Sequence, residues 1–586
     1  MGKTQRMRGG RLCLTAALLA CGGSLGCGDD DDGDAAAGLN IILANDDGWT
    51  TDGIQQLKLK LREAGHRVIL VAPGVAQSGV GPSFTFGEVP LEMQGQDEYS
   101  LAASPATCVH AAFALYDAEG ETVDLVVSGT NDNSNIGSAA TGSGTIGAVA
   151  AGLALGIPGI ASSSFRDGME GDESYVAHFA LVADLITELV DRITDDGDVT
   201  TDFPEGVALS VNYPPRDSNR IRGLRVAVQG VNAIHHISEM MEGFGSVPRD
   251  TIMNSDYFHY RMNRVTVTPL SPRHGAEVDG DTREMLMGAS LQTAPARSLE
   301  ILLTSEEPWD GEGLQAMADV LMAAGHVVTV SAPDVPSDGG ANKSDLSSPC
   351  ERELQGDGDG DGDGDGDGDG DGDGDGDADA GVAEFPINGH GVYSTNAPPS
   401  VCTGIAITEM YPKPHLIISG IQTRPHVGRQ LLHSGALGPI SMAIANGYPS
   451  LSVSTDGASG AELEGNAADV AALVAAMTHA QDGLLPEDLA LNVNFGSGAT
   501  LADMVFTHQG ESSDFSYTFI GDGELMSVDG PAFDAEEAQG ADTTAVAEGK
   551  LSVMGVRRDW TASQDVFPYF EGITEGLLEA VGVDGP

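Results

Sequence analysis

The sequence predicts an α/β protein with two tandem domains, each a mostly parallel sheet with helices on both faces. Two observations support this prediction. Long stretches of the first half recur in the second half, and within each half short apolar runs alternate with segments of helical periodicity. Because alternating strands and helices are typical of parallel sheets, each half should form one such domain.

The internal repeat is a duplication of a whole domain. "LNIILANDDGW" (39–49) matches "LEILLTSEEPW" (299–309), and the match continues without a gap at an offset of 260 positions. A second block, 124–158, matches 415–449 at an offset of 291. "LSVNYP" pairs in the same way with "LNVNFG", and "DTREMLMG" with "DTTAVAEG". We therefore predict domains at 39–295 and 299–586.

The elements of the first copy follow one another in a regular order. "NIILA" is a continuous apolar run, as expected for a strand buried on both faces. "GIQQLKLKLREAG" has helical spacing and ends at Gly65, and "HRVILVAP" and "VDLVVSG" are the next strands. A Gly/Ala-rich helix from about Thr145 and a fourth strand, "IPGIASS", complete the alternation.

The N-terminal segment predicts export. A basic head followed by the short apolar run "LCLTAALLAC" is typical of a signal sequence, here residues 1–27, and the run is too short to span a bilayer. "LLAC" resembles a lipobox, so Cys21 is the expected lipidation site, with Cys27 as the second choice. An acidic tether follows at 28–38. We expect a lipoprotein facing the periplasm or cell surface; an ordinary cleaved signal peptide is the alternative.

The charge balance limits the partners. The formal net charge is −60 and the pI is about 4.2, which repels nucleic acids and anionic membrane surfaces. We expect no nucleic-acid polymer as a partner, and contact with a membrane only through the lipid anchor. An anionic substrate would need a cation to bridge it to the protein. In the second copy a Gly-Asp alternation at 356–377 predicts an extended loop. Its spacing resembles calcium loops but lacks the closing Glu, so both interpretations stay open.

Polar motifs follow three predicted strands of the first copy. "NDDG" follows the first, "GVAQSGVGPSFT" (74–85) the second, and "SGTNDNSNIG" (128–137) the third. In an open parallel sheet such loops converge on one crevice. Asp46 and Asp47, with hydroxyl and amide oxygens nearby, suit a hard divalent cation such as Mg²⁺ or Mn²⁺. A polar turn is the alternative for an isolated Asp-Asp-Gly.

A fourth motif, "TGSGTIGA" (141–148), opens a helix with small residues. Backbone N–H groups at the start of a helix, with Ser143 and Thr145 as hydroxyl donors, would make a cradle for phosphate. Simple close packing of a Gly-rich helix against the sheet is the alternative.

Together with "SPATCV" and "GIP…ASS", these motifs resemble the SurE family of stationary-phase survival proteins, which are metal-dependent nucleotidases. The resemblance covers residues 39 to about 295 and implies a Rossmann-like fold with an extension that helps form dimers. It implies metal ligands at Asp46, Asp47, Ser78 and Asn131. It implies substrate or phosphate contacts at Asn45, Asn135, Ser143 and Thr145. Asn133 and Asp52 depart from the Gly and Pro that are usual in the family.

The resemblance also implies a reaction. The first copy should hydrolyse nucleoside 5′- and 3′-monophosphates with a divalent metal, Mn²⁺ or Mg²⁺, and Asp46 or Asp47 could take the proton of the attacking water. An exported nucleotide- or metal-binding lipoprotein without turnover is the alternative.

The second copy keeps the framework and changes the site. Glu306 and Glu307 replace the two aspartates, and the other changed positions are Pro308, Asp338, Gln422, His426 and Ala436. Because metal geometry tolerates little displacement, we predict a degenerate domain with little or no catalysis. A remodelled site is the alternative. We also predict that the two copies pack against each other as an intrachain pseudo-dimer.

Overall fold

The protein is described by a computed structural model. The described residues are 38–85, 87–165, 171–195, 198–199, 203–230, 252–272, 275–289, 294–333, 392–395, 399–410, 412–480, 483–486, 489–510, 514–520, 525–532, 540–557 and 559–583. The predicted signal with Cys21 and Cys27, Asp338 and the Gly-Asp stretch at 356–377 lie outside these ranges. Within them, no helix is both long and apolar enough to cross a membrane.

The first copy forms a sheet in the order β10-β11-β9-β6-β5-β1-β2-β4-β3. The run from β9 to β4 is parallel, and β11 and β3 join its two ends in the antiparallel sense. The strands are β1 (Asn40–Ala44), β2 (Arg67–Pro73), β3 (Gly87–Gly95), β4 (Glu98–Leu101), β5 (Leu125–Asn131), β6 (Gly159–Ser164), β9 (Ala208–Tyr213), β10 (Leu224–Val226) and β11 (Val265–Leu270). A small separate hairpin joins β7 (Thr194–Asp195) and β8 (Asp198–Val199).

Helices cover both faces of this sheet. Ile41 and Leu43 of β1 lie in the apolar cluster under α1 (Asp52–Glu63) and α4 (Glu173–Arg192). Ile42 and Ala44 lie in the cluster on the opposite face, under α2 (Pro105–Glu119) and α3 (Gly144–Ala154). Because successive side chains of a strand point to opposite faces, this double burial explains the unbroken apolar run.

The second copy repeats the arrangement in the order β22-β18-β17-β16-β13-β14-β15, with β19 beside β22. Its strands are β13 (Glu300–Thr304), β14 (Val327–Pro333), β15 (Val392–Thr395), β16 (Leu416–Gln422), β17 (Ser450–Thr455), β18 (Ala490–Phe495), β19 (Met504–Phe506) and β22 (Leu551–Val556). Its helices include α8 (Glu312–Ala323), α9 (Pro399–Glu409), α10 (Leu437–Ala445), α11 (Gly460–Thr478) and α12 (Asp542–Ala547). The predicted fold class, two tandem α/β domains, is therefore confirmed.

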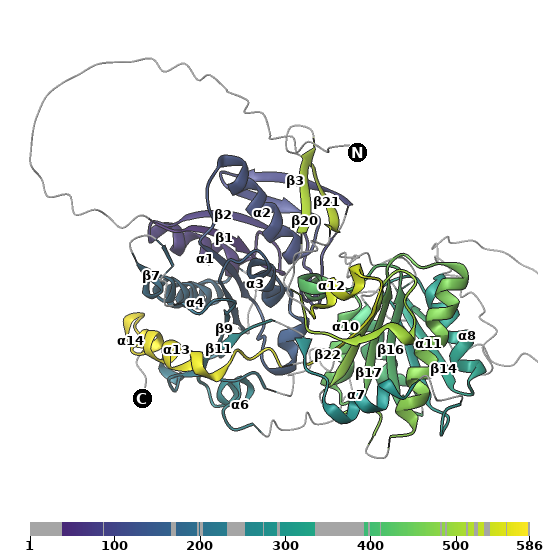
Figure 1. Ribbon diagram of the computed structural model, residues 1–586. Coiled ribbons are helices and arrows are strands. Elements are labelled where there is room, and N and C mark those ends of the chain that lie inside the picture. Colours follow the sequence, from purple (N-terminus) through teal and green to yellow (C-terminus); the bar gives the residue numbers. More distant parts are fainter. Residues whose placement is uncertain are drawn as a thin grey trace, which may run out of the picture.

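The two copies exchange their C-terminal segments. After β22 the chain returns to the first copy, where α13 (Phe567–Thr574) and α14 (Leu577–Ala580) pack against α4 (Figure 1). Phe570 and Leu577 are buried in the same apolar cluster as β1. In the opposite direction, α7 (Gly280–Met287) of the first copy packs against α11, and β12 (Gly275–Ala276) pairs with β22.

A hairpin of the second copy also extends the sheet of the first. β21 (Leu525–Ala532) pairs antiparallel with β3, and β20 (Asp514–Ile520) pairs with β21 (Figure 1). Main-chain pairing and apolar packing therefore both join the copies.

Candidate active site

The loops that follow β1, β2 and β5 meet at one end of the first sheet. The Gln77 backbone N–H donates to the carbonyl oxygen of Asp46 at 2.6 Å, which joins the loop after β2 to the loop after β1. The Asp132 N–H donates to Oδ2 of Asp47 at 3.0 Å, which joins the loop after β5. The three polar motifs thus converge as the sequence predicts.

Asp46 is held in a buried position. Asp46 is only 3% exposed. The Thr145 hydroxyl donates a hydrogen bond to its Oδ1 at 2.6 Å. A Cβ atom on Gly144 would lie 2.7 Å from the Asp46 Cβ, so the start of α3 can approach this closely only with glycine there. Burial raises the pKa of Asp46 from 3.8 to about 6, and the Thr145 hydrogen bond opposes this rise.

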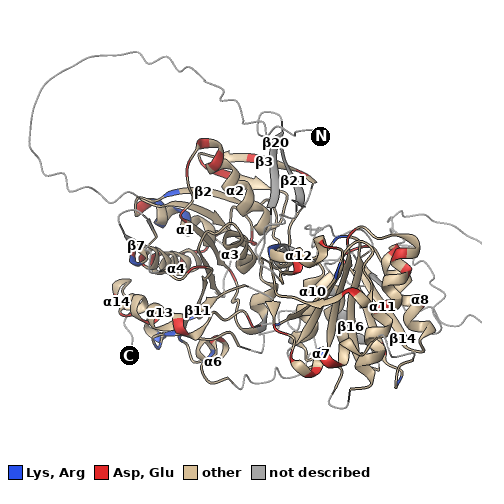
Figure 2. Cartoon of the chain, viewed as in Figure 1, with Lys and Arg blue, Asp and Glu red and all other residues tan. Residues whose placement is uncertain are grey.

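Asp47 stands beside Asp46 and is partly exposed. Burial, and then the charges of Asp46 and Asp132, raise its pKa well above the ordinary value. No basic group is among the principal influences on the pKa of either aspartate. Asp and Glu side chains also recur on outer helices of both copies, such as α2 and α7 (Figure 2). The site therefore concentrates negative charge that the neighbouring protein groups do not balance.

The residues fit a hard cation by the chemistry of their donors. Among the described residues, no group of three or more His, Cys, Asp and Glu side chains is placed to hold a metal ion. The predicted ligand set is of another kind, with two carboxylates, one amide and one hydroxyl. Asn131 donates its Nδ2 to the Asn133 carbonyl at 2.8 Å, so its amide oxygen is the end that can coordinate. Ser78 is exposed in the loop next to Gln77. All four are oxygen donors, the type that Mg²⁺ and Mn²⁺ prefer.

The other predicted binding residues lie around Asp46. Ser143 is the N-cap of α3, and its hydroxyl oxygen accepts the Ile146 N–H at 3.2 Å. Asn135 donates its Nδ2 to Thr145 Oγ1 at 3.2 Å and to Ser163 Oγ at 2.9 Å. The Thr145 hydroxyl in turn donates its hydrogen bond to Asp46. Asn135 and Thr145 therefore form a hydrogen-bonded chain that orients this carboxylate.

Asn45 serves the shape of its own loop. It is fully buried, and its Nδ2 donates to the Gly48 carbonyl at 2.9 Å while its Oδ1 accepts the Gly48 N–H at 3.2 Å. Gly48 has φ +113°, a conformation that favours glycine. This pair closes the turn that presents Asp46 and Asp47.

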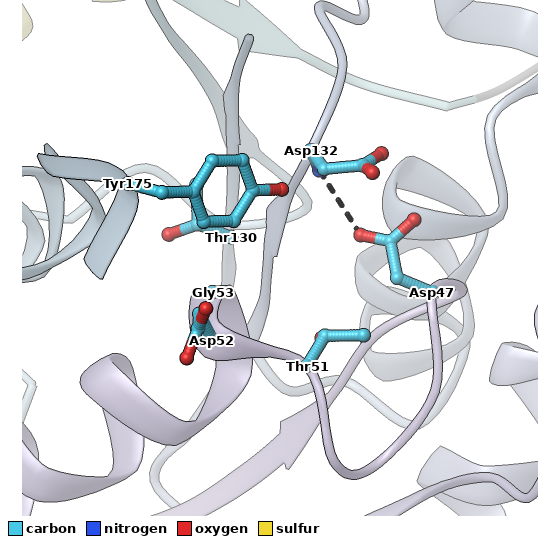
Figure 3. Close-up of a pocket in the computed structure, with 7 residues that line it drawn as sticks. All are labelled: Asp47, Thr51, Asp52, Gly53, Thr130, Asp132 and Tyr175. Carbon is cyan, nitrogen blue, oxygen red and sulfur yellow. Dashed lines mark hydrogen bonds between the residues drawn. The ribbon is translucent and has the colours of Figure 1, made fainter. Parts of the chain in front are cut away.

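A cavity of about 220 Å³ opens beside Asp47. Its lining residues come from the ends of β1 and β5 and the starts of α1 and α4 (Figure 3). They are Asp47, Thr51, Asp52, Gly53, Thr130, Asp132 and Tyr175. Of these, only Asp47 is singled out as a site residue by the sequence. Asp132 lies inside the "SGTNDNSNIG" motif, and Tyr175 lies in the first turn of α4. The position of Asp132 directly after β5 is the signal that could have found it, and Tyr175 has no such signal.

The equivalent position in the second copy is arranged differently. Glu307 accepts the Thr423 N–H at 2.7 Å, which repeats the contact of Asp47. Glu306, however, lies 3.1 Å from the His426 Nε2, and His426 occupies the position of Asn135. Ala436 replaces Thr145, and α10 begins only at Leu437, later than α3 does in the repeat. A side chain that can carry positive charge thus stands against the first carboxylate.

Comparison with known proteins places the chain in a family. The model of the family described as "Survival protein SurE" matches residues 41–236 and again 301–551. The chain belongs to the SurE family, as a tandem duplication. The 5'-nucleotidase SurE of Aquifex aeolicus is 37% identical over 196 residues, which cover 33% of this chain and 72% of that protein. The 5'-nucleotidase SurE of Actinobacillus pleuropneumoniae is 30% identical over 250 residues, covering 40% and 93%. The crystal structure of the Sure protein from Aquifex aeolicus aligns at 30% identity and a TM-score of 0.32, over 40% of this chain and 93% of that one.

Proposed function

We propose that the first copy is a divalent-metal-dependent phosphomonoesterase that hydrolyses nucleoside 5′- and 3′-monophosphates. The observation that carries the proposal is the pair of desolvated carboxylates, Asp46 and Asp47, at the meeting point of three loops. An anionic phosphate could not approach them without a cation. The names of the relatives, 5'-nucleotidase SurE, support the substrate class.

In this proposal Asp46, Asp47, Ser78 and Asn131 hold the cation. Mn²⁺ or Mg²⁺, when bound, would supply Lewis-acid polarisation and orient the attacking water. One of the two aspartates accepts the proton of that water, and the carboxyl pKa raised by burial favours such a role near neutral pH.

The chain's other groups position the substrate. Ser143 and the backbone N–H groups at the start of α3 hold the phosphate oxygens, as helix N-termini do for anions. Asn135 and Thr145 keep Asp46 in one orientation through their hydrogen bonds. The cavity beside Asp47 receives the nucleoside, with Tyr175 on its wall.

We further propose that the second copy acts as a built-in dimer partner without turnover, and that the chain is exported and anchored through a lipid on Cys21. The exchanged segments support the first part, and the motif around Cys21 supports the second. Labelling with a radioactive fatty acid, in the wild type and in Cys21→Ala and Cys27→Ala variants, tests the anchor.

The activity is tested with p-nitrophenyl phosphate and a nucleotide panel, with and without Mn²⁺ or Mg²⁺. We expect turnover that EDTA removes and that Asp47→Asn reduces at least about 100-fold. Glu307→Gln is the matched control, because Glu307 makes the same backbone contact in the second copy. Full activity in EDTA, or an unaffected Asp47→Asn enzyme, would contradict the proposal.

A further inference from the structure

The turn that leads into the phosphate-binding end of α3 is fixed by two buried side chains. The 3₁₀ turn η1 (Gly137–Gly142) runs directly into Ser143. The Gly137 N–H donates to both carboxylate oxygens of Asp256 at 3.1 Å, and its carbonyl oxygen accepts Gln229 Nε2 at 2.9 Å. Asp256 is 1% exposed and Gln229 is 3% exposed. The first residue of the turn is thus held on both of its backbone polar groups.

Gln229 also bonds to the second copy. Its Oε1 accepts the Trp560 N–H at 2.8 Å, and its own N–H donates to the Thr561 hydroxyl at 2.8 Å. Trp560 is 1% exposed and lies in the same apolar cluster as Ile146 of α3. The segment is anchored in turn, because the Ser271 N–H donates to the Trp560 carbonyl at 2.7 Å.

The second copy also contacts the other end of α3. Arg429, in the 3₁₀ turn η4 (Gly428–His433), donates from Nη1 to the Ala154 carbonyl at 2.7 Å. A cationic group at the C-terminus of a helix is electrostatically favourable. In addition, α10 packs against η1 and α3 packs against η4. Both ends of the helix that would hold the phosphate are therefore in contact with the second copy.

We propose that Gln229 is a positioning residue through which the 560–561 segment of the second copy sets the geometry of the turn from Gly137 to Ser143. The proposal rests on the proposed function, in that it assigns phosphate binding to this turn. It gives the second copy a role in the reaction of the first without any chemistry of its own.

The duplication supplies a matched control. Gln509 of the second copy donates its Nε2 to the Gly428 carbonyl at 2.9 Å, and its Oε1 accepts the Gly275 N–H of the first copy at 3.1 Å. This is the same arrangement with the copies interchanged, next to a turn that leads to Ala436 instead of Thr145. Gln509→Leu therefore removes equivalent hydrogen bonds at the turn that carries Arg429, which reaches only the C-terminal end of α3, away from Ser143.

The experiment compares Gln229→Leu, Thr561→Val and Gln509→Leu in the full-length chain. For Gln229→Leu we expect KM for p-nitrophenyl phosphate and the inhibition constant of inorganic phosphate to rise together, about fivefold or more. We expect kcat to change less than about twofold, because the change affects binding of the phosphate group. Partial unfolding would give the opposite pattern, with a lower kcat and an unchanged KM. Thr561→Val, a change at a partly exposed site, should act in the same direction, and Gln509→Leu should leave both constants at the wild-type values.

Hydrogen exchange provides a readout that does not need activity. Amides of residues 137–146 should exchange faster in Gln229→Leu than in the wild type, and those in Gln509→Leu should not. Unchanged exchange in Gln229→Leu, or an equal rise in KM in both Leu variants, would overturn the inference. A wild type without phosphatase activity would contradict the proposed function, and the exchange data would still decide whether Gln229 positions the turn.

Discussion

Asp46→Asn should remove activity and, in the absence of metal, stabilise the protein. The folded protein raises the pKa of this carboxyl from 3.8 to about 6, chiefly by burial. Keeping it ionised at neutral pH therefore costs the metal-free fold about 3 kcal/mol. Asparagine has the same shape and no charge, and its Oδ1 can still accept the Thr145 hydroxyl. We expect a gain of about 1 to 3 kcal/mol in EDTA at pH 8, with turnover reduced at least about 100-fold.

The sign of the pH dependence follows from the raised pKa. The folded carboxyl binds its proton more tightly than the unfolded one, so the cost is absent below about pH 4 and complete above about pH 6 to 7. Chemical denaturation in EDTA between pH 4 and pH 8 should show the advantage of the variant shrinking as the pH falls. With Mn²⁺ the order should reverse, because only the wild type gains from binding the cation.

A matched variant in the second copy controls for the loss of a carboxylate at the equivalent position. Glu306→Gln should bring no such gain, since Glu306 already has His426 at 3.1 Å. An Asp46→Asn protein that is less stable than the wild type in EDTA at pH 8 would refute the reasoning. An advantage independent of pH would refute it equally.

Three further predictions concern the second copy, the isolated first copy and Thr145. Glu306→Ala with Glu307→Ala should leave the turnover number within about twofold. A loss of about 1.4 kcal/mol of transition-state stabilisation would lower it tenfold, and a drop of that size would show that the second site is catalytically active. The first copy expressed alone should self-associate in light scattering, because Phe570 and the rest of the returned segment no longer cover its core; a stable, fully active monomer would count against this. Thr145→Val should lower turnover about tenfold by freeing Asp46 from its hydrogen bond, and Thr145→Ser should restore it.

The position of Asp46 and Asp47 in the fold could be predicted from the sequence. An unbroken apolar run such as Ile41–Ala44 fits only a strand covered on both sides, and a polar loop after it falls at a defined end of a parallel sheet. Repetition of this pattern after β2 and β5 was enough to bring the three loops together. The relation between the copies, read from two offsets, located the equivalent strands of the second sheet in the same way.

The contacts that complete the site could not be predicted from the sequence. Tyr175 lines the cavity because of how α4 is oriented, which no local pattern encodes. The hydrogen bonds from Asn45 to Gly48 and from Thr145 to Asp46 join residues whose side-chain orientation no sequence pattern encodes. The exchange of C-terminal segments depends on which domain each apolar helix face packs against. The apolar periodicity of a helix is the same whether it packs against the first copy or the second.

The differences between the copies follow from what each residue contacts. Phe570 and Leu577 of the second copy lie in the core of the first, and Leu286 of the first lies in the core of the second. A polar substitution at any of them would uncover apolar surface and destabilise both domains together. Glu306 and His426, by contrast, contact each other within one copy, so changing this pair leaves the other domain's core intact. Physical constraint thus falls on the apolar framework of the second copy and not on its polar site. A duplicated chain of this kind can lose one set of ligands and still need the domain that carried them, because that domain completes the fold of the first.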